Sequence, residues 1–286
     1  MRFNYLEPRT IKEAVSLLVQ YQGISEVIAG GTDLLNQIRR KMIKPEYVVD
    51  ISYIPGLDCI EYDAEGWLSI GALATIRSVE KSAEIQQRHP VISQAAGLMG
   101  SMAIRNVGTI GGNLCNASPS AETAPSLIGL GASVTLAGTD GKRTVALEEF
   151  FEGPGQTTLQ TGELMVEIRV PPMPPHAKGV YLKHTTRGTV NPAIVGVAAI
   201  ITTEGKRCVD VQLVLGAVAP TPIRAKKAEE ILRGEAMDDA LIEKAAWAAS
   251  DESSPISDVR ASADYRKDMV KVFARHALRT CHEVNP

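Results

Sequence analysis

Apolar residues recur with helical spacing near the start of the chain. They follow Thr10 at intervals of three and four positions: Ile11, Ala14, Val15, Leu17 and Leu18. This spacing predicts a helix over about residues 11–22, and Thr10 with Glu13 forms a capping-box pattern at its start. Short apolar runs at 26–29 and 47–51 predict buried strands, and residues 34–41 between them predict a second helix. The first part of the chain therefore predicts a small βαβ lobe.

The pattern changes after about residue 55, where short apolar runs alternate with stretches of helical spacing. The runs that predict strands are 67–70, 133–137, 144–146 and 164–170, and the stretches that predict helices are 76–83, 85–98 and 122–130. The sequence Gly-Thr-Asp-Gly at 138–141 is typical of a hairpin turn between two of these strands. We expect a second lobe of mixed α/β structure.

Four prolines at positions 171, 172, 174 and 175 interrupt any strand or helix, since proline lacks the N–H donor and fixes φ. We place a domain boundary there. Beyond it, apolar runs predict three antiparallel strands and helical spacing predicts three helices: 179–186, 193–203 and 208–215, then 224–233, 238–250 and 263–278. The expected organisation is α+β, with a domain of residues 1–172 (lobes of about 1–55 and 56–172) and a C-terminal domain of residues 176–286 made of a three-stranded sheet and a three-helix cluster.

Composition narrows the classes of function. The 286 residues include 30 basic and 33 acidic side chains, a net charge of -3, so the chain lacks the overall positive charge that holds a nucleic-acid backbone. No stretch approaches the roughly 20 apolar residues of a membrane span. We expect a cytoplasmic protein with no nucleic-acid partner and no membrane span.

Cysteine and histidine spacing indicates no metal site on this chain. The four cysteines lie far apart and form no CxxC pair, and the five histidines show no HxxxH or HExxH spacing. An iron-sulfur cluster, if electrons pass through one, is expected on another polypeptide.

A glycine pair interrupts the chain between the predicted strand at 26–29 and the predicted helix at 34–41. The segment reads Ile28-Ala29-Gly30-Gly31-Thr32-Asp33-Leu34-Leu35. Adjacent glycines permit positive φ and leave no Cβ in the way, so consecutive backbone N–H groups can surround an anion such as a pyrophosphate. A tight turn without a ligand is an equally good explanation of this segment on its own.

A second glycine-rich segment, residues 104–122, is more specific. It contains Thr109-Ile110-Gly111-Gly112-Asn113 and Ala117-Ser118-Pro119, and it is too polar for a core element yet too apolar for a disordered linker. We expect a buried loop that offers backbone donors to a large polar ligand. Neither segment has the G-x-G-x-x-G spacing of a Rossmann site, and no phosphate-binding P-loop is present. Two separate glycine loops favour a long ligand with two ends.

These motifs together resemble the medium, flavoprotein subunit of the xanthine dehydrogenase and aerobic carbon monoxide dehydrogenase family, the molybdenum hydroxylases. The likeness extends over nearly the whole chain. It includes Tyr181-Leu182-Lys183, which is similar to the family's Tyr-x-Lys strand, and residues 262–266, which resemble its closing helix. The resemblance implies a two-lobed FAD-binding domain like that of vanillyl-alcohol-oxidase/PCMH proteins, followed by a C-terminal flavoprotein domain.

The resemblance also implies which residues bind FAD. Residues of the two motifs are implied to bind the pyrophosphate and its neighbouring groups. They are Ile28, Ala29, Gly30, Gly31, Thr32, Asp33, Leu34, Thr109, Gly111, Gly112, Asn113 and Ser118. Glu122, where the family more often has Asp, is implied to contact sugar or ribityl hydroxyls. Met165 is implied to lie beside the flavin ring, and Tyr181 and Lys183 to approach it from the C-terminal domain.

The function implied by the resemblance is electron transfer within a complex. A large subunit oxidises the substrate at molybdopterin, a small subunit relays electrons over [2Fe-2S] clusters, and FAD on this chain passes them to NAD, oxygen or a quinone-linked carrier. A dimer of heterotrimers is the implied assembly. Two alternatives stay open: a self-sufficient FAD-dependent oxidase or dehydrogenase, and a non-catalytic nucleotide-binding protein.

Overall fold

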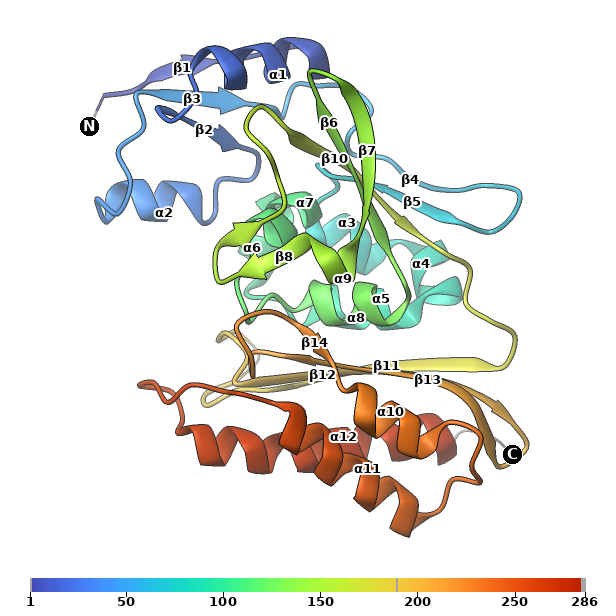
Figure 1. Ribbon diagram of the computed structural model, residues 1–286. Helices are drawn as coiled ribbons and strands as arrows, with labels where there is room; N and C mark the ends of the chain where they lie inside the picture. Colours follow the sequence, from blue (N-terminus) through green and yellow to red (C-terminus); the bar gives the residue numbers. More distant parts are fainter. Residues whose placement is uncertain (1, 189, 284–286) are drawn as a thin grey trace.

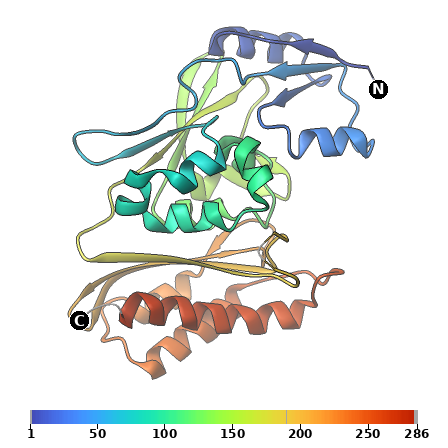
Figure 2. The ribbon, with the colours of Figure 1, turned by 180° about the vertical axis from the view of Figure 1, so that it is seen from behind.

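The computed structural model describes residues 2–188 and 190–283. The elements form successive layers, seen from two sides in Figures 1 and 2: a small N-terminal lobe, a second lobe of sheet and helices, and a C-terminal sheet with helices on its far side. No helix within the described ranges is long and apolar enough to cross a membrane.

The small lobe is a parallel three-stranded sheet with two helices. Its strands pair in the order β1-β3-β2, and the elements are β1 (Asn4–Leu6), α1 (Ile11–Gln20), β2 (Ser25–Ile28), α2 (Leu34–Arg39) and β3 (Tyr47–Asp50). The Thr10 side chain accepts from the Glu13 N–H and the Glu13 carboxylate accepts from the Thr10 N–H, which confirms the capping box. The sequence did not predict β1, because this three-residue strand depends on pairing with the distant β3.

The second lobe contains a five-stranded sheet with the order β4-β5-β10-β6-β7. Its strands are β4 (Ile60–Tyr62), β5 (Leu68–Gly71), β6 (Ser133–Gly138), β7 (Gly141–Ala146) and β10 (Leu164–Val170). The central strand β10 is antiparallel to both neighbours. The hairpin turn predicted at 138–141 joins β6 and β7 and is confirmed by the pairing of Gly138 with Gly141. A two-stranded ribbon lies beside this sheet and consists of β8 (Phe151–Gly153) and β9 (Gln156–Thr157).

The helices of the second lobe are short. They are α3 (Ile76–Lys81), α4 (Ala83–Arg88), α5 (Pro90–Gly97), α6 (Met102–Val107), α7 (Ile110–Cys115), α8 (Thr123–Gly129) and α9 (Leu147–Phe150). The single helix predicted over 85–98 is wrong, because Pro90 has no N–H to continue α4 and instead begins α5 at its first turn. The second glycine segment is likewise not an open loop, since α6 and α7 occupy most of it.

The C-terminal part is an antiparallel sheet with the order β11-β12-β13-β14, covered on one face by three helices. The elements are β11 (Ala177–His184), β12 (Val195–Glu204), β13 (Arg207–Gly216), β14 (Ile223–Arg224), α10 (Lys226–Leu232), α11 (Asp239–Glu252) and α12 (Ala263–Glu283). The sequence predicted three strands in this sheet and did not predict the fourth, β14. The two-residue strand β14 carries no alternating pattern of its own, and its pairing with β13 defines it.

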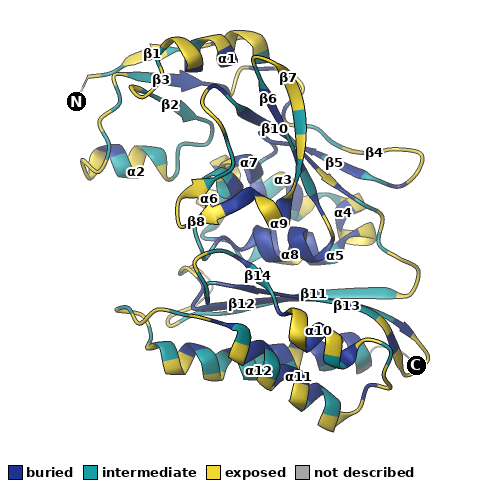
Figure 3. Cartoon of the chain, in the orientation of Figure 1, coloured by how far each residue is buried: buried dark blue, intermediate teal, exposed yellow. Residues whose placement is uncertain are grey.

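Both faces of β12, an inner strand of the C-terminal sheet, are buried along most of its length (Figure 3). Along β12, Ala198 and Ile200 belong to the core of the second lobe, whereas Val197, Ala199 and Ile201 belong to the core beneath the helices. This alternation follows the period of two in a strand. The sheet therefore joins the two parts of the chain through a shared apolar core.

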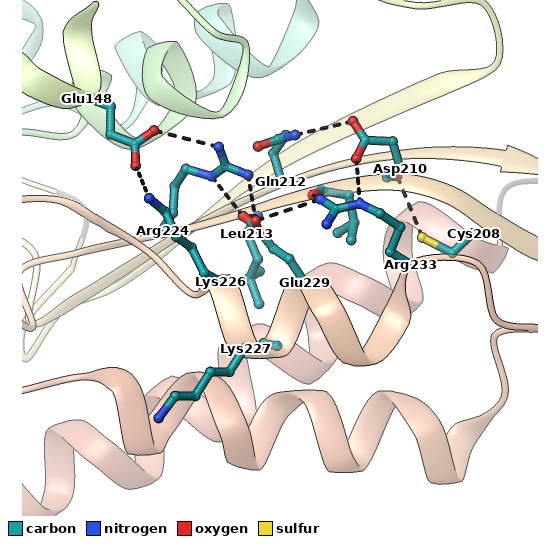
Figure 4. Close-up of polar contacts among 12 residues, drawn as sticks. Glu148, Cys208, Asp210, Gln212, Leu213, Arg224, Lys226, Lys227, Glu229 and Arg233 are labelled. Carbon is teal, nitrogen blue, oxygen red and sulfur yellow. Dashed lines mark hydrogen bonds and ion pairs between the residues drawn. The ribbon is translucent and has the colours of Figure 1, made fainter.

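Polar contacts reinforce this junction at one edge (Figure 4). Glu148 on α9 forms ion pairs with Arg224 at 3.6 Å and Lys226 at 3.0 Å, which belong to the C-terminal part. Arg224 also binds Glu229, whose side chain is 2% exposed and accepts the Leu213 N–H at 2.9 Å. The network connects α9 with β13, β14 and α10.

Candidate functional site

The two glycine segments lie in direct contact. A Cβ added to Gly30 would stand 2.0 Å from the carbonyl oxygen of Val107 and 2.9 Å from Cα of Gly108. No side chain fits there, since real Cβ contacts are never so short. The sequence prediction that both segments serve one site is therefore supported by their packing, and Gly30 is required for close approach.

A cavity of about 510 Å³ lies between the two lobes at this contact. That volume is typical of a site for a cofactor-sized ligand. Its walls come from β2, the first glycine segment, α2, α7 and β10, with these lining residues: Ser25, Glu26, Val27, Ala29, Gly30, Gly31, Thr32, Asp33, Leu34, Gln37, Ile51, Ala72, Leu73, Met99, Gly108, Thr109, Gly111, Gly112, Asn113, Cys115, Asn116, Gly155, Leu159, Glu163, Leu164 and Met165.

The first glycine segment presents backbone donors to the cavity. Gly31 has φ +67°, a conformation that favours glycine. The N–H groups of residues 30–33 make no hydrogen bond within the described part of the chain. Consecutive unpaired N–H groups at a cavity wall form a favourable site for an anion.

The second glycine segment uses its glycine donors internally. The N–H of Gly111 donates to the Ala72 carbonyl at 2.9 Å, and that of Gly112 donates to Thr109 Oγ1 at 3.1 Å. A Cβ on Gly111 would lie 2.7 Å from the Ala72 carbonyl oxygen. These two glycine N–H groups are thus paired within the chain, and Gly111 allows α7 to pack closely against Ala72, directly after β5.

Asparagine side chains provide the polar groups of α7. Asn113 Oδ1 accepts from Thr123 Oγ1 at 2.5 Å, which fixes the orientation of its amide. Its Nδ2 donors have no partner in the described chain, and Asn113 lines the cavity together with Asn116. This part of the wall can donate hydrogen bonds from side chains rather than from the backbone.

Acidic side chains differ in their environment within the cavity. Glu163 accepts from Arg143 Nε at 2.7 Å and Nη2 at 2.8 Å, and these bonds lower the pKa of its carboxyl group. Glu26 forms no hydrogen bond or ion pair in the described chain, and desolvation raises the pKa of its carboxyl group. Burial raises the pKa of the Cys115 thiol to about 12, which disfavours the thiolate form of this cavity-lining cysteine.

Eleven of the sixteen residues predicted as cofactor contacts line the cavity, from Ala29 to Leu34, Thr109, Gly111 to Asn113, and Met165. Five do not: Ile28, Ser118, Glu122, Tyr181 and Lys183. Ile28 ends β2, and the Ser118 hydroxyl bonds to that of Ser120 at 3.1 Å.

Glu122 and Lys183 pair with each other across the junction of the two parts. Their charged groups lie 2.8 Å apart, with side chains 8% and 1% exposed. Lys183 Nζ also donates to the Leu98 carbonyl at 2.8 Å, next to Met99, which lines the cavity. Burial raises the pKa of the Glu122 carboxyl, and the Lys183 ammonium opposes that shift. The pair holds β11 against the end of α5 and the start of α8.

Several lining residues escaped the sequence analysis. Ser25, Glu26, Gln37, Ile51, Leu73 and Glu163 come from regular elements and loops far apart in the chain. The spacing of apolar residues around them predicts only strands and helices. That spacing does not distinguish a residue in a cavity wall from one in the core or on the surface. Cys115 and Asn116 stand within the second glycine segment, where the resemblance assigned them no role.

A cofactor-sized cavity between two lobes, with unpaired backbone N–H groups at its wall and no Rossmann motif, is the arrangement expected of a flavin-binding protein of the two-lobed class. The family models agree: "FAD binding domain in molybdopterin dehydrogenase" matches residues 1–173, and "CO dehydrogenase flavoprotein C-terminal domain" matches residues 180–281. The chain belongs to this family of FAD-binding subunits of molybdenum hydroxylases.

Relatives match the chain over nearly their whole length. The chain is 31% identical over 277 residues to the glyceraldehyde dehydrogenase medium chain of Sulfolobus acidocaldarius, covering 97% of each chain. It is 32% identical to the carbon monoxide dehydrogenase medium chain of Afipia carboxidovorans, covering 96% and 95%. A structure of carbon monoxide dehydrogenase from Hydrogenophaga pseudoflava superimposes with a TM-score of 0.95 at 34% identity, covering 98% and 97%.

The site fits the cofactor of this family. FAD has a pyrophosphate between two hydrogen-bonding halves, and the cavity wall has unpaired N–H groups where the glycine segments meet. Gly30 allows the two segments to meet at this wall, because a Cβ there would collide with the backbone of Val107 and Gly108.

Proposed function

We propose that this chain holds FAD in the cavity between its lobes, with the pyrophosphate on the N–H groups of residues 30–33. The observation that supports this most directly is that these four consecutive donors are unpaired at the wall of a ligand-sized cavity. Thr32, Asn113 and Asn116 add side-chain hydrogen bonds. Glu122, Tyr181 and Lys183 act from behind this wall, since they lie at the junction with the C-terminal sheet.

Bound FAD would supply a centre that accepts electrons singly and releases them in pairs. The residues of this chain bind and orient the cofactor and exclude water from it. We assign the chain the task of taking electrons from [2Fe-2S] clusters of a small subunit and passing them to an external acceptor. Substrate oxidation belongs to a large molybdopterin subunit.

The proposal includes the finer organisation of the protein. A FAD-binding domain of residues 1–172, with lobes of about 1–55 and 56–172, precedes a C-terminal domain of residues 176–286, and the two family models support this division. A dimer of heterotrimers is the proposed assembly, in the cytoplasm, with NAD, oxygen or a quinone-linked carrier as acceptor.

Anaerobic mixing of the FAD-loaded chain with carbon monoxide, purines, aldehydes and N-heterocycles tests the electron-transfer role. We expect no bleaching of the flavin absorption band with the chain alone, and bleaching once large and small subunits are added. Bleaching without partners would identify a self-sufficient flavoenzyme. Failure of the purified chain to take up FAD would favour a nucleotide-binding protein of another kind.

A further inference from the structure

Helix α6 joins two parts of the cavity wall. Met99 lines the cavity shortly before α6 begins, and Gly108 lines it directly after α6 ends. None of the six residues of α6, all of which the structure describes, is buried, and Met102 and Val107 are 58% and 52% exposed. The helix is therefore held in place by contacts other than burial in a core.

The end of α6 is fixed by backbone contacts. The Gly108 carbonyl accepts from the Ile76 N–H at 2.9 Å, and the Val107 carbonyl oxygen lies directly against Gly30. The unpaired N–H groups of residues 30–33 begin at this contact. The position of α6 thus determines whether the cavity wall is closed beside these donors.

The start of α6 is fixed by one arginine side chain. Arg105 Nη1 donates to the carbonyls of Met99 at 3.0 Å and Gly100 at 3.1 Å, and Nε donates to Glu80 on α3 at 2.9 Å. The two charged side chains are 13% and 14% exposed. Hydrogen bonds between charged groups are stronger than those between neutral ones. Arg105 therefore attaches both the helix and the turn before it to α3.

Glu80 is itself held firmly. Its carbonyl accepts from Gln86 Nε2 at 2.9 Å and from Ser93 Oγ at 2.8 Å, so α4 and α5 fix its position. The Leu98 carbonyl, just before the segment, is bound from β11 by Lys183. Loss of the Arg105 contacts would therefore release residues 99–106 while the chain on either side stays attached.

We propose that the Arg105–Glu80 ion pair is a latch on α6, and that its opening lets FAD enter and leave the cavity. This inference rests on the proposed function, because it requires FAD on the N–H groups of residues 30–33. Neither Arg105 nor Glu80 is among the described residues that line the cavity. Arg105 is thus a positioning residue, and the latch has the same strength with and without the cofactor.

The two rate constants of FAD binding test the latch. Stopped-flow mixing of the cofactor-free full chain with FAD gives the association rate constant. Exchange of bound radiolabelled FAD against excess unlabelled FAD gives the dissociation rate constant. We expect Arg105→Met to raise both by about tenfold or more, because a hydrogen bond to a charged group shifts a closed–open equilibrium by that factor. Kd should change by less than about threefold, since the latch does not distinguish the free chain from the loaded one.

Arg77→Met is the matched control. Arg77 binds the same Glu80 carboxylate at 2.9 Å, but it belongs to α3 and not to α6, so both rate constants should stay unchanged. Arg105→Lys should recover part of the effect, because an ammonium keeps the charge but lacks the fork of donors. Glu80→Gln, which preserves the shape of the anchor, should raise both rate constants less than Arg105→Met does. These two variants carry the same test if Arg105→Met does not fold.

The outcomes separate this inference from the proposed function. Unchanged rate constants in Arg105→Met, with FAD still bound, would overturn the latch and leave FAD binding established. An increase in the dissociation rate constant alone would also overturn it, since Arg105 would then support the bound cofactor instead of an opening. Equal effects of Arg77→Met and Arg105→Met would point to general loss of packing around Glu80. A wild-type chain that binds no FAD would overturn both proposals.

Discussion

His89 shows how one buried side chain connects distant parts of the second lobe. The residue is 1% exposed, its Nε2 lies 2.9 Å from the Pro171 carbonyl, and its Nδ1 lies 2.8 Å from the Tyr62 hydroxyl. A carbonyl only accepts, so Nε2 carries the proton and Nδ1 accepts from Tyr62. The neutral ring therefore satisfies both contacts, and its role is structural.

Protonation of His89 should destabilise the fold. Desolvation lowers the pKa of His89 below its ordinary value, so the unfolded chain binds the proton at a higher pH than the folded chain does. The part of the stability that depends on the neutral ring is fully present above the pKa that His89 has in the unfolded chain. It is lost as pH falls through the lower pKa that His89 has in the folded chain. Thermal unfolding followed from pH 7.5 to 5 should show this loss, and His89→Gln should flatten the curve. His176→Asn, at an exposed site, should leave it unchanged.

The Glu122–Lys183 pair allows a second test on single residues. Lys183→Met leaves the Glu122 carboxylate buried without its cation, which should cost about 3–5 kcal/mol in the free energy of unfolding. The double variant Glu122→Gln with Lys183→Met should be less destabilised than Lys183→Met alone. Urea unfolding of the cofactor-free protein measures both, and equal losses in the two variants would show that the pair is not coupled.

At the scale of elements, the contact between the glycine segments sets the shape of the cavity. Gly30→Ala should force the first segment away from Val107 and weaken FAD binding by more than about tenfold, because the added Cβ meets backbone rather than a movable side chain. Gly97→Ala is the matched control, since its Cβ would lie 3.6 Å from Glu80. Flavin content after gel filtration reports both, and normal content in Gly30→Ala would contradict the assignment.

Long periodic elements could be predicted from sequence, and short ones could not. The helix after Thr10 and the strand at 164–170 carry their own cap or apolar run, and both appear as expected. By contrast, β1 and β14 exist only through pairing with distant strands, and Pro90 determined a helix boundary that the apolar spacing concealed. The sequence predicted the glycine motifs from the chemistry of their residues. It did not predict which of their N–H groups are free and which are paired, because that depends on the positions of Ala72 and Thr109 in the fold.

At the scale of the whole molecule, the C-terminal sheet completes the core of the second lobe. Tyr181, Ala198, Ile200 and Val214 all belong to that core. A fragment of residues 1–173 should therefore expose apolar surface and bind a hydrophobic dye or aggregate. If the full chain is cut within residues 173–176, its two pieces should instead elute together on size-exclusion chromatography. A 1–173 fragment that is stable and monomeric would show that the shared core is dispensable.

The position of β10 at the centre of its sheet has a consequence for synthesis on the ribosome. Strands β5 and β6 emerge first, yet they are joined only through residues 164–170, and Met165 from that strand also lines the cavity. The apolar core of the lobe is covered only after Ile200 and Val214 of the C-terminal sheet have also been synthesised. The nascent chain thus has no finished binding site during most of its translation. We therefore expect cofactor capture to be a late event, and we expect cellular FAD supply to act on nearly complete chains rather than on early intermediates.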